Sequence, residues 1–301
     1  MVFSFPRIVK ARLFCLTLFL ATLLVASQAL AAMGGPKPDK MGILLVAFGT
    51  TYSDGGKAYE NIEAKVKEAF PGVDVRWAYS SSIIRHILRE KGEQIDSPSK
   101  ALARMQEEGF TQVAVQSLQT IPGEEYNEVL ETTKAFAEIP MGFKQVEVGP
   151  PLLYATHDVE RVADALMAVV PAERKPADAV IFVGHGTSHP GNIYYPGLQY
   201  FLAKKDPLAL VGTVEGFPTR EDVLATLKAK GVKKAWLVPF LAVAGDHVHN
   251  DIAGDGPESW KSILGKAGVE SEPVMKGTGE DDPIVAIWVD HLKLAVSRFK
   301  K

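Results

Sequence analysis

The chain has 301 residues, a formal net charge of −3 and a single cysteine, Cys15. The acidic balance argues against a nucleic-acid-binding surface, because such surfaces carry a clear excess of Lys and Arg. A single cysteine excludes an internal disulfide, and its place in the apolar amino-terminal segment leaves the rest of the chain without a thiol for catalysis or metal binding.

The amino-terminal segment has the pattern of a secretory signal peptide. Three basic residues within 7–12 precede an apolar run over 13–25, and Ala29-Leu30-Ala31 matches a small-x-small cleavage site. An uncleaved anchor is the alternative, but the run is short for a membrane span. We therefore expect 1–31 to be removed and the mature protein to be periplasmic, with no stable membrane anchor. Cleavage would remove three basic and no acidic residues, which leaves 30 Lys and Arg against 36 Asp and Glu.

Strand and helix patterns alternate through the first half of the remaining chain. Apolar or alternating runs predict strands at 42–48, 73–79, 111–118 and 143–148. Apolar residues at helical spacing predict helices at about 54–70, 82–91, 98–108 and 124–138. Ser97-Pro98 and Gly109 are typical of the two ends of the third helix.

The alternation begins again after Gly149-Pro150-Pro151. Strands are expected at 179–183, 208–214 and 235–241, and helices at about 156–170, at 219–230 and after Asp282-Pro283. This order predicts an α/β fold of two similar lobes, each a parallel sheet flanked by helices, with a cleft between them. We place the lobes at 32–150 and 151–301, with the last helix free to pack back on the first lobe.

Two pairs of similar sequence segments, which we call the sequence repeats, support this division into similar lobes. The segment 45–51 resembles 182–188, and later 115–125 resembles 237–247, in the same order. We interpret the sequence repeats as an internal duplication. The alignment pairs Phe48 with His185 and Glu125 with His247.

His185 stands at the abrupt end of the most apolar strand. The run 179–183 is typical of a strand buried on both faces, and Gly184-His185-Gly186-Thr187 follows it directly. Ligands bind at the carboxyl ends of strands in open α/β sheets. A loop histidine with a purely structural role is the alternative.

Glu215 and His247 follow two further strands of the same lobe. Because the carboxyl ends of parallel strands share one edge of a sheet, we expect both side chains to lie near His185. Two imidazoles and a carboxylate suit a divalent first-row metal, and imidazoles also exchange protons near neutral pH. Three unrelated loop residues are the alternative interpretation.

These segments resemble the class II chelatases, and among them the anaerobic sirohydrochlorin cobaltochelatases. The resemblance rests on 44–51, on Gly184-His185-Gly186-Thr187, on Val214-Glu215-Gly216 and on 239–247, and it covers the chain from about Met41 to the terminal helix. It implies that His185, Glu215 and His247 are the catalytic residues, binding the metal and accepting protons. It also implies that the lobes hold a tetrapyrrole between them and that Co²⁺ is inserted for cobalamin or sirohaem biosynthesis. Fe²⁺ is the alternative metal, and no organic cofactor is evident.

The substrate of such an enzyme carries acidic side chains, which need hydroxyl or basic partners. Ser80, Ser81, Ser82 and Arg85, at the predicted strand-to-helix turn of the first lobe, are the candidate substrate-binding residues. A plain helix cap is the alternative explanation for this turn.

The signal peptide departs from the resemblance, because tetrapyrrole metallation of this kind is cytoplasmic in most members. A periplasmic metal- or tetrapyrrole-binding carrier with the chelatase fold is therefore the alternative function. A relative that uses the same three residues for hydrolysis or redox chemistry is a further one. The expected partners are a tetrapyrrole and a divalent metal, without nucleic acid, and a homo-oligomer is compatible with the sequence.

Overall fold

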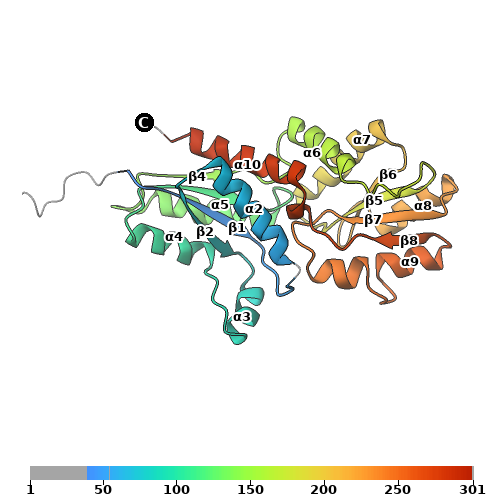
Figure 1. Cartoon of the computed structure of the whole chain (residues 1–301), viewed down its shortest axis with the longest axis horizontal. Coiled ribbons are helices and arrows are strands. Elements are labelled where there is room, and N and C mark those ends of the chain that lie inside the picture. The colour runs from blue at the N-terminus through green and yellow to red at the C-terminus, as the bar shows by residue number, and fades with distance from the viewer. Residues whose placement is uncertain (1–38, 54, 300–301) are drawn as a thin grey trace, which may run out of the picture. The chain divides into compact units, whose positions relative to one another are not determined.

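The computed structural model describes residues 39–53 and 55–299, so the predicted signal peptide lies outside the described residues. The described residues form two four-stranded sheets with helices on their faces (Figure 1). All strand pairs in both sheets are parallel. The predicted α/β fold of two similar lobes is thereby confirmed. No helix in the described part of the chain is long and apolar enough to cross a membrane.

The first lobe contains four strands and four helices that follow one another in the described sequence. Its strands are β1 (Met41–Ala47), β2 (Asp74–Tyr79), β3 (Gln112–Ser117) and β4 (Gln145–Gly149), arranged in the order β2-β1-β3-β4. Its helices are α2 (Gly55–Ala69), α3 (Ser82–Glu90), α4 (Pro98–Glu107) and α5 (Glu124–Ala137).

The second lobe repeats this strand order. Its strands are β5 (Ala179–Gly184), β6 (Ala209–Thr213), β7 (Lys234–Pro239) and β8 (Glu270–Pro273), in the order β6-β5-β7-β8. Its helices are α6 (Thr156–Ala168), α7 (Tyr194–Lys205), α8 (Arg220–Ala229) and α9 (Trp260–Lys266), and α10 (Asp282–Ser297) follows β8. The central strands β1 and β5 are almost completely buried, as their apolar runs predict.

Side chains of the central strands alternate between two cores, as the pleat of a strand requires. On β1, Leu44 and Val46 pack with α4 and α5, whereas Ile43 and Leu45 face the side of α2 and α10. The second core continues without interruption to Phe182 of β5 and to the apolar faces of α6 and α7. A single hydrophobic core therefore connects the two lobes.

The same backbone hydrogen bonds recur in both lobes. Leu118 N donates to Val46 O in the first lobe, and Phe240 N donates to Val183 O in the second. Likewise, Gly123 N donates to Ile121 O, and Gly245 N donates to Val243 O. These hydrogen bonds join residues that the sequence repeats align with each other, so the duplication extends to the loops that follow the strands.

Three elements were not predicted from the sequence. The helix α7 contains Pro196 and Gly197 near its start, α9 has only 7 residues, and β8 is the polar segment Glu-Ser-Glu-Pro. None of the three has apolar residues at regular helix or strand spacing over a long enough segment to predict the element. Tertiary packing supplies what the local pattern does not, because Leu198, Leu202, Trp260 and Leu264 are fully buried.

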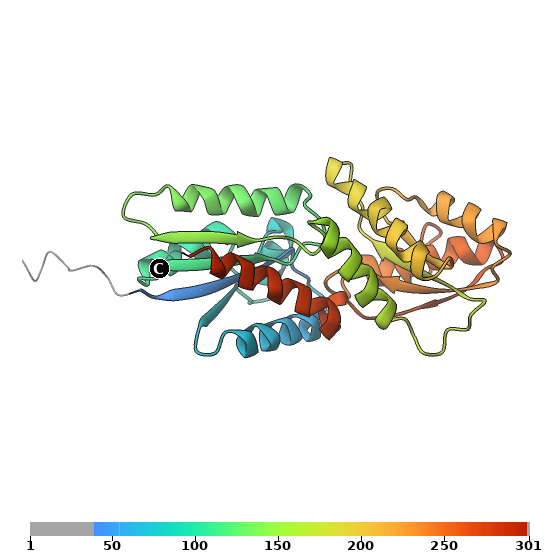
Figure 2. The ribbon, with the colours of Figure 1, turned by 90° about the horizontal axis from the view of Figure 1, so that it is seen from above.

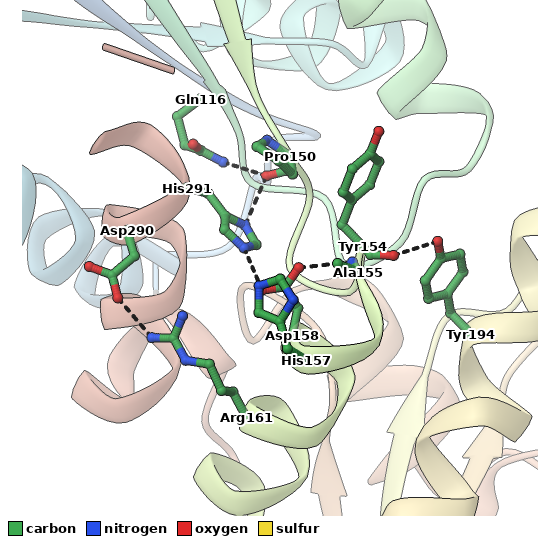
Figure 3. A network of polar contacts seen from close by, with 10 residues as sticks. All are labelled: Gln116, Pro150, Tyr154, Ala155, His157, Asp158, Arg161, Tyr194, Asp290 and His291. Atoms are coloured by element: carbon green, nitrogen blue, oxygen red, sulfur yellow. Dashed lines mark hydrogen bonds and ion pairs between the residues drawn. The ribbon is translucent and has the colours of Figure 1, made fainter. Parts of the chain in front are cut away.

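A network of polar contacts lies where the chain passes from one lobe to the other (Figure 3). His291 of α10 places Nε2 3.0 Å from Asp158 Oδ1 of α6 and Nδ1 3.3 Å from the carbonyl oxygen of Pro150. Gln116 of β3 donates to the same carbonyl, and Asp158 also accepts from Ala155 N. The joint between the lobes therefore has a buried polar centre inside the shared apolar core.

The helix α10 follows the last strand of the second lobe but packs on the first. It contacts β3, β4 and α2, as well as α6 across the joint (Figures 1 and 2). Its apolar face includes Ile284, Trp288 and Leu292, all fully buried. One face of the first sheet is thus covered by a helix that comes from beyond the second.

Candidate active site

The loop after β5 presents His185 at the carboxyl end of the central strand. Gly186 follows with a φ of +80°, a left-handed conformation that favours glycine, and a Cβ at this position would collide with the backbone of Gly216. Glu215 N donates to His185 O at 2.8 Å, so the loops after β5 and β6 are bound to each other. The glycines of this motif therefore allow two loops to pack in direct contact.

His247 lies beyond β7, directly before a short π-helical turn, η2 (Val248–Ile252). Val248 and Ile252 are fully buried in the core of the second lobe and anchor this turn. The Nδ1 atom of His247 lies 2.7 Å from Asp251 Oδ2, one turn further along. Single π-helical turns of this kind occur frequently at functional sites.

The structure brings the imidazoles of His185 and His247 together. Their ring centroids are 4.5 Å apart and their planes meet at 86°. His185 Nδ1 lies 2.7 Å from the carbonyl oxygen of Gly186. Because this carbonyl and the Asp251 carboxylate are acceptors, Nδ1 is the donor in each ring, and a neutral imidazole in this tautomer has its lone pair on Nε2.

These histidines line a cavity of about 430 Å³ between the two lobes. The residues that line it from the first lobe include Phe48, Tyr52, Tyr59, Ile84, Glu124 and Glu125, and those from the second lobe include His185, Tyr195, Glu215, Leu241, Asp246 and His247. Most lie in loops after strands, so the carboxyl edges of both sheets face this space. Apolar walls with a few polar groups are typical of a site for a small organic ligand.

The charged residues around the cavity are acidic. Glu124, Glu125, Glu215 and Asp246 line it, and none of the lining residues in the described part of the chain is Lys or Arg. Such a lining attracts cations and offers no countercharge to an anionic group placed deep inside.

Glu215 shares the cavity with the two histidines but does not join them in a closed ligand set. Over residues 39–53 and 55–299, no three or more His, Cys, Asp or Glu side chains form a group that could hold a metal ion as they stand. The predicted ligands therefore comprise a close imidazole pair and one exposed carboxylate on an adjacent loop. A metal bound by all three would require Glu215 to move toward the rings.

The predicted substrate-binding turn lies in the position that corresponds to Glu215. Ser81 N donates to Phe48 O as Glu215 N donates to His185 O, so the turn 80–82 is the first-lobe equivalent of 214–216. Ser81 Oγ accepts from Ile84 N and caps α3, and Arg85 donates to the carbonyl oxygens of Tyr79 and Ser80. None of Ser80, Ser81, Ser82 and Arg85 lines the cavity, and burial lowers the pKa of Arg85.

Two tyrosines border the cavity as neutral hydroxyl groups, Tyr195 buried and Tyr59 partly buried. Burial raises the pKa of Tyr195 to about 12 and raises the pKa of Tyr59 well above its usual value. Neither phenol can act as a base near neutral pH. Among the side chains that line the cavity, the imidazoles of His185 and His247 are therefore better suited as proton acceptors than these phenols.

Three residues of the site escaped the sequence analysis as functional candidates. Glu125 entered it only as the counterpart of His247, Tyr52 comes from the first lobe, and Asp251 lies in the turn after His247. The repeat itself pointed to Glu125, because the alignment pairs it with His247 and equivalent residues of two similar lobes lie at equivalent positions of the fold. For Tyr52 and Asp251 no local pattern exists, because their partners are set by the cleft and by the π-helical turn.

The other described histidines lie outside this pair. His86 is exposed on α3, His189 binds Gly191 N and contacts Asn127, and His157 is exposed beside Asp158. His291 is buried in the joint described above. His249 stacks on Tyr52 at the border of the cavity.

Comparison with known proteins shows similarity over almost all of the described chain. The family model "Cobalt chelatase (CbiK)" matches residues 41–297. A sirohydrochlorin cobaltochelatase, CbiKC, of Nitratidesulfovibrio vulgaris is 45% identical over 258 residues, which cover 86% of this chain and 91% of the relative. A sirohydrochlorin cobaltochelatase of Salmonella typhimurium is 34% identical over 262 residues, which cover 86% of this chain and 97% of the relative.

Solved structures share the fold at low sequence identity. SirB from Bacillus subtilis with Fe³⁺ has a TM-score of 0.56 and 15% identity, covering 85% of this chain and 95% of its own. CbiX, described as the terminal enzyme for biosynthesis of siroheme in denitrifying bacteria, has a TM-score of 0.53 and 16% identity, covering 84% and 99%. These matches support the two-lobed architecture.

Proposed function

The chain belongs to the cobalt chelatase (CbiK) family, and we infer that it is a sirohydrochlorin cobaltochelatase, which inserts Co²⁺ into this tetrapyrrole at the cavity between the lobes. The single observation that supports this site most strongly is the edge-to-face pair of His185 and His247 inside that cavity. Both side chains line the cavity, and the surrounding walls combine apolar surface with carboxylates.

We propose that His185 and His247 accept the two protons that metallation releases. Insertion replaces two pyrrole N–H protons by one divalent ion, so two bases are needed near the centre of the macrocycle. A neutral imidazole accepts a proton readily near neutral pH. The Asp251 carboxylate holds His247 in orientation, and the carbonyl of Gly186 does the same for His185.

We further propose that His185, Glu215 and His247 bind the incoming metal as substrate. Imidazole and carboxylate suit Co²⁺ and also Fe²⁺, and they bind more weakly than thiolates. The open arrangement of Glu215 favours a site that receives an ion and passes it on over one that retains it. The other acidic residues of the lining, Glu124 and Glu125, favour entry of a cation from the same cavity.

The macrocycle would lie between Phe48 and Ile84 of the first lobe and the histidines of the second. We expect the cleft to hold it bent, because a planar ring hides its nitrogen lone pairs, and remote binding energy can be spent on such distortion. Its carboxylates would point out of the acidic lining. Ser80, Ser81, Ser82 and Arg85 remain our candidates for binding them, provided that Arg85 exchanges its present carbonyl partners for a carboxylate.

The function is tested by following the absorbance of sirohydrochlorin with Co²⁺ or Fe²⁺ and purified protein lacking residues 1–31. We expect rapid conversion to the metallated spectrum with Co²⁺, well above the rate without protein. Stoichiometric binding of metal or tetrapyrrole without turnover would instead indicate the carrier function. Hydrolysis of esters or phosphates without a tetrapyrrole would contradict both.

We also propose that the enzyme acts in the periplasm after cleavage behind Ala31. This proposal is supported by the basic start, the apolar run over 13–25 and the small-x-small site. The absence of cysteine after Cys15 suits an oxidising compartment. Cleavage also leaves the protein without a membrane anchor.

A further inference from the structure

One residue of the first lobe reaches across the cavity to the segment that carries His247. The Tyr52 hydroxyl donates to Asp246 Oδ1 at 3.0 Å. The Tyr52 ring stacks on His249, with centroids 4.6 Å apart and planes within 10° of parallel. Tyr52 therefore touches the residues on both sides of His247 in the sequence.

The segment that Tyr52 touches is internally bonded. Asn250 donates to the same Asp246 oxygen at 2.8 Å, and His247 binds Asp251. Val248 N donates to Gly245 O, and the side chain of Val248 is fully buried. A displacement of Asp246 would therefore be transmitted to the imidazole of His247.

The two loops also approach each other closely beside this contact. A Cβ on Gly245 would lie 3.2 Å from Thr50 Oγ1, and Tyr52 N donates to that same oxygen. Glycine at 245 thus lets the loop after β1 sit against the loop before His247. The hydrogen bond to the Asp246 carboxylate raises the pKa of Tyr52, so its hydroxyl stays a donor.

We propose that Tyr52 is a positioning residue, through which the first lobe sets the place of His247 relative to the wall formed by Phe48 and Glu125. The inference rests on the proposed function, because it assigns Tyr52 a role in the same insertion reaction. Tyr52 acts on the distance between the two walls of the cavity, which a bound macrocycle spans. Misplacement by a fraction of an ångström affects catalysis more than binding of either substrate alone.

The test compares the wild-type protein with Tyr52→Phe, a variant that keeps the ring stacked on His249 and removes only the hydrogen bond to Asp246. We expect kcat for cobalt insertion to fall about tenfold, in proportion to a hydrogen bond to a charged acceptor. The affinity for Co²⁺ alone should fall less than kcat, because two of the three proposed ligands, His185 and Glu215, lie on other loops. Tyr200→Phe is the matched control, since this exposed tyrosine of α7 lies outside the cavity lining.

A double-mutant cycle with Asp246→Ala isolates the contact from other effects of Asp246. If Tyr52 acts through Asp246, the two changes together will cost little more than Asp246→Ala alone. Additive losses in kcat, or a Tyr52→Phe enzyme with unchanged kcat, would overturn the proposal.

Hydrogen exchange gives a readout that does not depend on turnover. Tyr52→Phe should speed the exchange of amides in 245–252 and leave those of β5 and β6 unchanged. If the wild-type protein inserts no cobalt, the proposed function fails while the exchange experiment still tests the contact. Unchanged exchange in 245–252 would show that Tyr52 does not restrain this segment.

Discussion

The imidazoles of His185 and His247 meet edge to face at 4.5 Å, yet different partners orient them. A backbone carbonyl holds His185, whereas the Asp251 carboxylate holds His247. A carboxylate strengthens the orientation of a histidine and stabilises positive charge on it, which a carbonyl does less well. The two imidazoles therefore lie next to each other in the site but have different hydrogen-bond partners.

Removal of either ring should abolish most of the activity. His185→Ala and His247→Ala each lose a proton acceptor and a metal ligand, and general base catalysis alone contributes about 10²–10⁴-fold. Initial rates of cobalt insertion measure the loss, with folding checked by circular dichroism. His86→Ala, on the exposed face of α3, is the control. Wild-type rates in both folded variants would place the active site elsewhere.

Asp251→Asn should lower the rate while the protein stays folded. The amide keeps the size of the side chain but loses the charge that holds His247, and loss of such a partner typically costs about 10–100-fold. The measurement is kcat for insertion together with Co²⁺ affinity. Asp255→Asn, an exposed residue paired with Lys261, should change neither value. Equal rates for the Asp251 and Asp255 variants would mean that His247 needs no carboxylate.

Glu215→Gln should weaken metal binding more than tetrapyrrole binding. It removes the charge from the proposed carboxylate ligand on the loop after β6 and keeps the shape of the side chain. Co²⁺ titration by calorimetry and sirohydrochlorin titration by absorbance give the two affinities. Glu221→Gln, exposed in the first turn of α8, controls for a general change of charge. Equal weakening of both ligands would show that Glu215 does not act on the metal.

His291→Ala should destabilise the protein without touching the cavity. The change removes the buried ring partner of Asp158 and leaves this buried carboxylate with only the exposed His157 and the Ala155 amide, and breaking such a buried pair costs about 3–5 kcal/mol. Urea unfolding measures the free energy. His157→Ala is a matched control, because it contacts the same Asp158 oxygen from an exposed position and should cost less than about 1 kcal/mol. Similar losses in both variants would contradict the role of burial.

The mature protein should begin near Ala32. Amino-terminal sequencing of protein from fractionated cells, with a cytoplasmic marker enzyme as the control for leakage, checks both the cleavage site and the compartment. A cytoplasmic product that retains Met1 would rule out export.

The fold was predictable because all the described strands except β8 are short apolar or alternating runs that alternate with helical patterns. The approach of His185 to His247 also followed from the sequence, since the carboxyl ends of parallel strands share an edge. The positions of Tyr52 and Asp251 did not, because one depends on how the lobes face each other and the other on a π-helical turn. The same limit applies to Arg85, whose charge predicted a ligand-binding role although its guanidinium contacts backbone carbonyls.

The packing of α10 on the first sheet has a consequence for the order in which the chain can fold. A chain that emerges amino end first exposes the face of β1 and β3 until all strands of the second lobe have appeared, because the 16 residues of α10 come after them. Amino-terminal domains usually fold first during synthesis. The first lobe, however, cannot complete its core until α10 has been synthesised. A fragment ending near Pro150 would therefore keep an apolar face open to aggregation or to a chaperone.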